Sequence, residues 1–170
     1  MLSLLDSVFL TLLARGVAVD QDGSVYVADS NNQRLMKWSV SATQGVVIFG
    51  DKGIGNRTDQ LNTPAALIRD KNGTIFVVDE RNDRIVAVRE GTQNGIVIAG
   101  GSDQLNSPIY LAFNRKGDLY ISDSNNFRVQ VFTIENGPVS RSIHIFVSNW
   151  SSLSGFLSVI VLVIKAITFR

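Results

Sequence analysis

Short, largely apolar runs of four residues recur three times along the chain, each preceded by a glycine and followed by an aspartate. The runs cover 25–28, 75–78 and 119–122 and are rich in β-branched and aromatic residues, which favour strands. Because they are apolar on both faces, each run predicts a strand that is covered from both sides. The pattern therefore predicts an all-β protein in which these runs are central strands of small sheets.

The polar residues around the runs keep the same spacing in every copy. An aspartate lies six residues after each glycine, an asparagine three residues further on, and an arginine two residues after that. The glycines lie 50 and then 44 residues apart, a period typical of four-stranded propeller blades. The recurring residues are Gly23, Asp29, Asn32 and Arg34, then Gly73, Asp79, Asn82 and Arg84, then Gly117, Asp123, Asn126 and Arg128.

Turn chemistry separates the predicted strands. Each recurring glycine stands where a short hairpin needs a residue with positive φ. The Asp- and Asn-rich segments after the runs predict tight turns between the second and third strands, held by side-chain to backbone hydrogen bonds. Glycine-bounded runs at 45–50 and 95–100 predict a fourth strand in the first two copies, and no run with this pattern follows Phe132.

Together these features resemble NHL repeats. The resemblance rests on a Leu-x-x-Pro lead-in, the glycine hairpin, a Val-Ala-Asp-like strand end and an Asn-x-Arg-hydrophobic strand start, and it covers about two thirds of the chain. The first copy departs from it, with Ala14 where the others have Pro64 and Pro108. The resemblance implies a partial β-propeller of about three four-stranded NHL blades. Since NHL propellers close about six blades into a ring, it also implies further blades from a second chain or a longer gene product.

We expect the blades within 15–147, at about 15–59, 60–103 and 104–147. The apolar segment 1–14 is a poor secretory signal, because an aspartate interrupts it and no basic residue precedes it; a remnant of a preceding blade and a weak signal are the two interpretations. The tail 148–170 is hydrophobic, and its apolar stretch 153–164 is shorter than the about 20 residues of a spanning helix. A hydrophobic C-terminal helix that anchors the chain in a membrane is therefore an open alternative.

Composition excludes several kinds of site. Sixteen Lys and Arg face fifteen Asp and Glu, so the net charge of +1 gives no global attraction to nucleic acid or anionic lipid. The absence of cysteine excludes disulfides, thiol nucleophiles and cysteine-based zinc sites. His144 is the only histidine, so one chain cannot assemble a histidine-based triad or multi-histidine metal site. We therefore expect no catalytic residue, no metal site and no cofactor.

The expected function is protein recognition by a non-catalytic scaffold whose variable rim loops contact the partner. The longest variable loop, 51–59, supplies the candidate binding residues. In ubiquitin ligases that this sequence resembles, the NHL domain selects substrates and a separate Cys/His-rich module performs the transfer, so the resemblance implies at most the recognition half. The candidate residues are Asp51, Lys52, Asn56, Arg57 and Asp59.

Two other functions stay open. Arg34, Arg84 and Arg128 either form ion pairs within their turns or make an arc on one rim that grips RNA phosphates, as the resemblance to RNA-binding NHL domains permits. Acidic residues in the same turns and the lack of a regular aromatic partner favour the ion pairs. The second alternative is a metal-dependent, lyase-like propeller enzyme, for which a single histidine offers little.

The compartment is not fixed by the sequence. Glycosylation sequons begin at Asn56, Asn72 and Asn149 and matter only if the chain is secreted. We favour the cytoplasm, with membrane attachment through 153–164 and secretion as alternatives.

Overall fold

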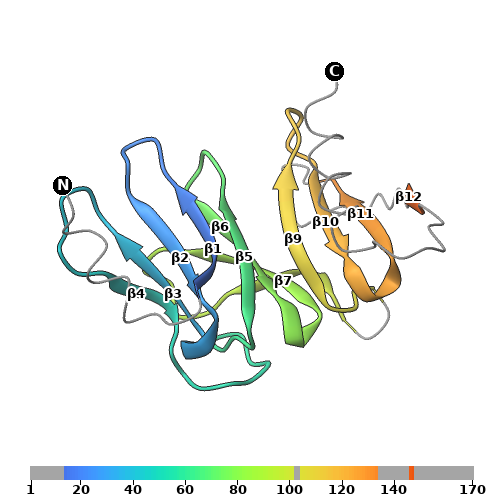
Figure 1. The fold of residues 1–170 in the computed structure, drawn as a ribbon, viewed down its shortest axis with the longest axis horizontal. Coiled ribbons are helices and arrows are strands. Elements are labelled where there is room, and N and C mark those ends of the chain that lie inside the picture. The colour runs from blue at the N-terminus through green and yellow to red at the C-terminus, as the bar shows by residue number, and fades with distance from the viewer. Residues whose placement is uncertain (1–13, 102–103, 134–145, 148–170) are drawn as a thin grey trace.

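The computed structural model describes residues 14–101, 104–133 and 146–147, which form three four-stranded antiparallel sheets (Figure 1). In each sheet the strands follow one another in chain order, as in a propeller blade. Blade 1 contains β1 (Ala14–Val19), β2 (Val25–Asp29), β3 (Arg34–Trp38) and β4 (Val46–Gly50); blade 2 contains β5 (Pro64–Arg69), β6 (Thr74–Asp79), β7 (Arg84–Arg89) and β8 (Ile96–Gly100); blade 3 contains β9 (Pro108–Phe113), β10 (Leu119–Asp123), β11 (Arg128–Phe132) and β12 (Phe146–Val147).

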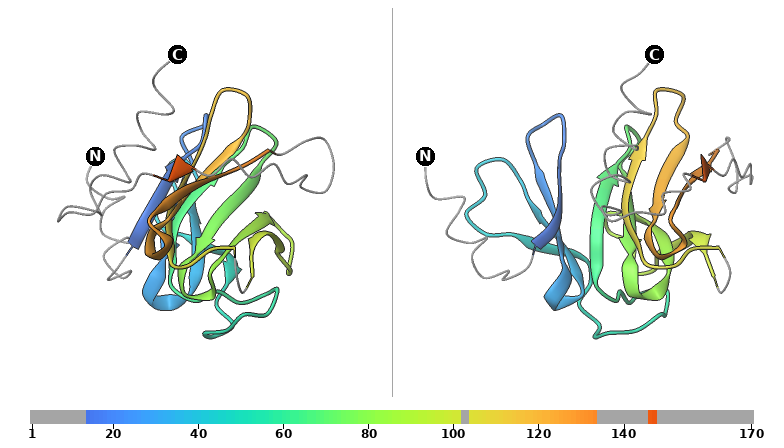
Figure 2. Two further views of the ribbon diagram at one scale, coloured as in Figure 1. Left: turned by 90° about the vertical axis from the view of Figure 1, so that its right-hand side faces the viewer. Right: turned by 45° about the vertical axis from the view of Figure 1, so that its right-hand side comes forward.

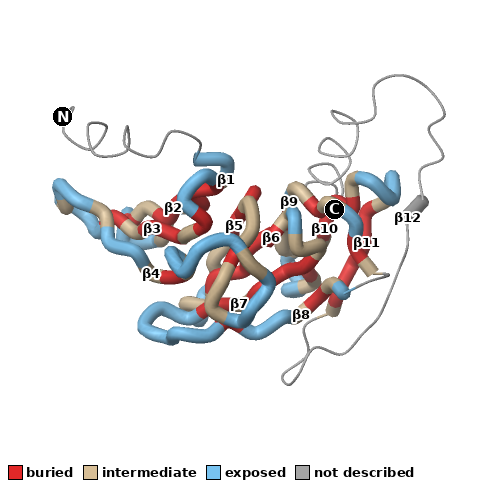
Figure 3. Tube along the Cα trace, turned by 90° about the horizontal axis from the view of Figure 1, so that it is seen from below, coloured by how far each residue is buried: buried red, intermediate tan, exposed pale blue. Residues whose placement is uncertain are grey.

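The three blades stand side by side, and β5, the first strand of blade 2, lies between β1 and β9, the first strands of the other two blades (Figures 1 and 2). Two apolar clusters fill the space between neighbouring blades, so the core lies between sheets rather than within one sheet (Figure 3). At their closest approach the first strands leave no room for a side chain, because a Cβ on Gly16 would lie 2.7 Å from the Ala66 Cα. The prediction of an all-β partial propeller is confirmed.

The predicted turns are also present. Gly23, Gly73 and Gly117 have φ values of +85°, +85° and +92°, in the region that glycine adopts without steric cost. Each donates its backbone N–H to the carbonyl three residues earlier and closes a tight hairpin. The polar segments form single 3-10 turns between the second and third strands of each blade: η1 (Ser30–Asn32), η2 (Glu80–Asn82) and η3 (Ser124–Asn126).

The fourth strand of blade 3 is present, as a four-stranded blade requires, although no glycine-bounded run marks it in the sequence. This strand, β12, pairs with Arg128 and Val129 of β11. It contains only two residues, too few to show a strand pattern in the sequence. The segment 1–13, the tail 148–170 and His144 lie outside the described residues. Within the described part of the chain, no helix is long and apolar enough to cross a membrane.

Candidate functional site

The loop between β4 and β5, which contains the candidate residues, is held against blade 2 through its main chain. Arg84 donates three hydrogen bonds to loop carbonyls, at 2.6, 3.0 and 2.9 Å, and Asn82 donates a fourth at 2.8 Å. The backbone N–H of Gly95 donates to the Thr58 carbonyl at 2.7 Å. The loop therefore has a defined path before any partner binds. The carbonyls that Arg84 and Asn82 hold belong to Gly55, Asn56, Arg57 and Gln60.

The same arginine explains how the long loop is accommodated. In blade 3, where the corresponding loop is shorter, Arg128 donates to the Gln104 carbonyl at 2.7 Å, and this bond matches that from Arg84 to Gln60. In blade 2, the remaining guanidinium N–H groups of Arg84 bind the inserted residues. The inserted residues are therefore held by guanidinium N–H groups of the arginine that recurs in every repeat.

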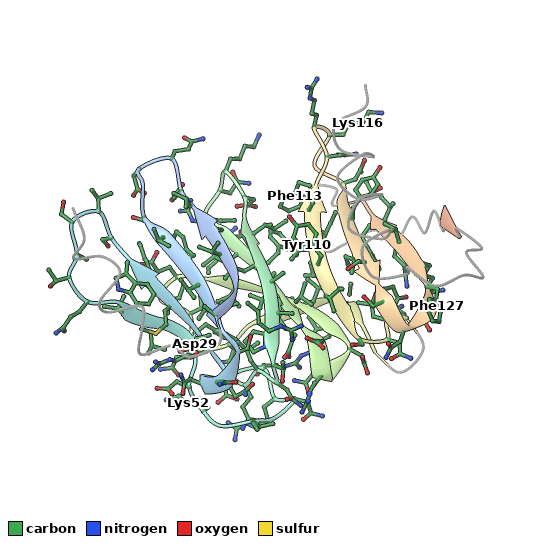
Figure 4. The ribbon with its side chains drawn as sticks, in the orientation of Figure 1. Asp29, Lys52, Tyr110, Phe113, Lys116 and Phe127 are labelled. Carbon is green, nitrogen blue, oxygen red and sulfur yellow. The ribbon has the colours of Figure 1, made fainter. Side chains whose placement is uncertain are left out.

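The loop presents four of the five predicted residues at the surface. Asp51, Lys52, Asn56 and Arg57 are exposed, with Lys52 at the lower edge of the molecule in Figure 4. Asp59 is turned partly inward, where one carboxylate oxygen binds Arg57 at 2.8 Å and the other is buried without a hydrogen-bond partner.

Sequence reasoning did not single out Ile54, an apolar side chain that is 67% exposed among polar loop residues. A hollow of about 310 Å³ lies beside the loop, lined by Lys52 and Asp59 together with residues 47–50 and 92–94. The loop therefore combines one exposed apolar side chain, charges of both signs and a concave surface. An isolated apolar residue in a polar loop gives no periodic signal, and its exposure is visible only in the fold.

The recurring aspartates are fully buried and act as the centres of their turns. Each accepts hydrogen bonds from the side chains of the recurring asparagine and arginine, with Arg Nε to carboxylate distances of 2.9, 2.7 and 2.6 Å in blades 1 to 3. Asp79 and Asp123 also accept a backbone N–H from the loop before their blade, at 2.6 and 2.7 Å. Burial raises the pKa of Asp79, and the hydrogen bonds from its neighbours oppose that shift. Each carboxylate therefore connects its turn to the third strand of the blade, and in blades 2 and 3 it also holds the loop that precedes the blade.

The recurring arginines lie on one rim, but their guanidinium groups point at their own aspartates. Arg84 is nearly buried, and Arg34 and Arg128 are about four-fifths buried. Their donors are engaged by carboxylates and, for Arg84 and Arg128, by main-chain carbonyls. This geometry favours the ion-pair interpretation over an open cationic arc. No group of three potential metal ligands occurs among the described residues.

The sequence model of the NHL repeat family matches residues 11–38 and 105–132. The chain carries NHL repeats. The two matched segments contain the hairpin glycine, aspartate, asparagine and arginine of blades 1 and 3, and the same residues recur in blade 2. No curated protein matches this NHL-repeat chain.

Solved structures share the fold. A streptogramin B lyase matches with a TM-score of 0.57 and 15% identity over 80% of this chain and 41% of its own. A virginiamycin B lyase from Staphylococcus aureus matches with a TM-score of 0.55 and 13% identity, again over 80% and 41%. A nidogen/laminin complex matches with a TM-score of 0.60 and 24% identity over 76% and 47%. The NHL-repeat chain therefore spans less than half of each of these propellers, and these identities show the fold alone.

Proposed function

We propose that this NHL-repeat chain is a non-catalytic scaffold that recognises a protein partner through the loop 51–59. The observation that carries the proposal is the anchoring of the loop main chain by Arg84 and Asn82. A loop that is already ordered loses little conformational freedom on binding, so more of its contact energy contributes to affinity.

The chemistry of the loop suits a protein surface. Ile54 provides an apolar anchor, and exposed polar and charged residues surround it, as in the centre and rim of a protein interface. Asp51 and Asp59 balance Lys52 and Arg57, so the loop lacks the single-sign charge that binds a phosphate backbone. These features support protein recognition over RNA binding.

The repeat and its neighbours support the same class of function. NHL repeats generally mediate protein interactions, and one structural neighbour is a complex between nidogen and laminin. The role of substrate recognition in a ubiquitin-ligase system rests on the family resemblance and is part of the proposal. The lyase alternative rests on fold similarity at 13 and 15% identity.

The test is site-specific photocrosslinking in the full chain. A photoreactive amino acid at position 54 is expected to capture a protein, and Lys52→Ala with Arg57→Ala is expected to reduce capture. The matched control carries the same group at Lys116, an exposed residue at the opposite rim (Figure 4). Equal capture from both positions would contradict a dedicated loop site. Capture that disappears with ribonuclease and depends on Arg34, Arg84 and Arg128 would instead support the RNA alternative.

A further inference from the structure

A hollow of about 500 Å³ lies between the hairpins at the tips of blades 2 and 3. It is lined by residues 69–72, Phe76 and 113–117. These hairpins precede the second strands of their blades, whereas Arg84, which holds the loop 51–59, follows the second strand of blade 2. The hollow therefore lies on the rim opposite the loop. Its volume is within the range of about 300–1,000 Å³ of pockets that bind small molecules.

The floor of this hollow is aromatic. Phe76 and Phe113 meet edge to face, with 5.1 Å between their ring centres, and both line the hollow. Phe113 is half-buried and lies below the hairpin that carries Lys116 in the view of Figure 4. By the repeat spacing, the equivalent pair between blades 1 and 2 is Tyr26 and Arg69, whose guanidinium lies 5.6 Å from the Tyr26 ring centre. Between blades 2 and 3 an aromatic ring replaces that cation, so the floor offers a surface for a planar apolar group.

Three cations at the edge of the hollow are exposed and form no ion pair with any described residue. They are Lys71, Arg115 and Lys116. The fourth lining cation, Arg69, is already paired with Asp20 at 2.6 Å. Asp70 is the one acidic residue of the described lining, and one of its carboxylate oxygens accepts the backbone N–H groups of Asn72 and Thr74 at 2.9 and 2.8 Å. The lining therefore carries more positive than negative charge, even after Arg69 is set against Asp20.

The positive charge is confined to this part of the rim. The two tip residues are uncharged and acidic in blade 1, basic and uncharged in blade 2, and both basic in blade 3: Gln21 and Asp22, Lys71 and Asn72, and Arg115 and Lys116. An extended polyanion that continued along the rim would meet the exposed Asp22 carboxylate. Asp118, which follows the blade 3 tip, is bound by the Asn114 side chain at 2.7 Å and does not line the hollow. This charge pattern favours a short anion that occupies the hollow alone.

We propose that this hollow binds a small molecule in which an aromatic ring carries a phosphate group. The ring would pack against Phe113, and the phosphate would lie at the edge of the hollow, where the Arg115 guanidinium can donate paired hydrogen bonds to it. Lys71 from blade 2 and Lys116 from blade 3 would add positive charge on either side. The site is separate from the loop 51–59, and a small molecule bound here would not account for the capture of a protein at position 54.

The first test measures ligand affinity by isothermal titration calorimetry with the full chain. The probe is naphthyl phosphate, and inorganic phosphate and naphthol each carry one half of its chemistry. We expect one-to-one binding of naphthyl phosphate, with an affinity about 10-fold or more above that of either half, because the aromatic contact and the charge both contribute. Arg115→Glu is expected to weaken this binding about 10-fold. The matched control is Arg81→Glu, which makes the same charge change at an exposed site in η2, beyond the opposite end of β6, and is expected to leave the affinity unchanged.

A second variant tests the aromatic floor. Phe113→Leu should bring the affinity for naphthyl phosphate close to that for inorganic phosphate, while inorganic phosphate itself binds as it does to the wild type. No binding of naphthyl phosphate, equal wild-type affinities for naphthyl phosphate and inorganic phosphate, equal effects of Arg115→Glu and Arg81→Glu, or tighter binding of a single-stranded oligonucleotide would overturn the proposal. Each variant must retain the circular dichroism spectrum of the wild type. If Phe113→Leu unfolds, the comparison of naphthyl phosphate with inorganic phosphate on the wild type still tests the aromatic contact.

Discussion

Arg84 links three parts of the molecule, and its replacement by alanine should be strongly destabilising. Its Nε donates to the buried Asp79 carboxylate at 2.7 Å, and its terminal nitrogens hold three carbonyls of the loop 51–60. In Arg84→Ala, Asp79 would keep only the bonds from the Asn62 backbone and the Asn82 side chain. A buried charge that loses its partner costs about 3–5 kcal/mol.

The equivalent arginine of blade 1, Arg34, allows this loss of stability to be compared with a second variant of the same protein. Arg34 donates Nε to the equally buried Asp29 at 2.9 Å but makes no bond to a loop carbonyl in the described part of the chain, so Arg34→Ala should cost less than Arg84→Ala, by about 0.5–1.5 kcal/mol for each of the three loop bonds that only Arg84 makes. The free energy of unfolding is measured by urea titration, with circular dichroism as the signal, for the wild type and both variants. The dependence of this free energy on urea concentration (the m-value) should be the same in all three proteins. In the double variant Arg84→Ala, Asp79→Asn, no unpaired charge remains, so part of the stability should return. An Arg84→Ala loss no larger than that of Arg34→Ala would refute this account of the turn.

Two further predictions concern Asp79 and Gly16. Because burial raises the pKa of Asp79 above its ordinary value of 3.8, the folded state binds the proton more tightly than the unfolded state. This group's contribution to the free energy of unfolding should therefore increase as the pH falls from the folded pKa toward 3.8, and Asp79→Asn should remove that component from unfolding curves measured across acidic pH. A pH dependence identical in both proteins would contradict the assignment. Gly16→Ala should cost about 1–3 kcal/mol in urea unfolding, because its Cβ would lie 2.7 Å from the Ala66 Cα; an unchanged midpoint would show that the two strands separate freely.

The blades were predictable from sequence because their defining residues interact locally. Gly23 closes a hairpin within its own copy, and Asp29 binds Asn32 and Arg34 a few residues away, so spacing alone encodes these contacts. The same logic applies to the other two copies and explains why the turns were placed correctly.

Contacts between repeats were not predictable in this way. Gln33, Asp83 and Phe127 share one backbone conformation but have different side chains, so no common residue marks the position. The bonds from Arg84 to the loop span 24 to 28 residues and depend on how blade 2 meets the preceding connection. Of the candidate site, sequence reasoning identified the variable loop, but the anchoring of its backbone and the exposure of Ile54 required the fold.

Because Arg84 and Asn82 bind carbonyl oxygens, the backbone position of the loop does not depend on which side chains the loop carries. Every residue type has a main-chain carbonyl, so most substitutions in 51–59 would leave the bonds from Arg84 and Asn82 intact. Gly53 is an exception, since its φ of +76° is a backbone conformation that residues with a side chain rarely adopt. The side chains of this loop can therefore be varied while the blade keeps its backbone in place. This makes the loop a suitable site for a library from which new binding specificities are selected without redesigning the blades.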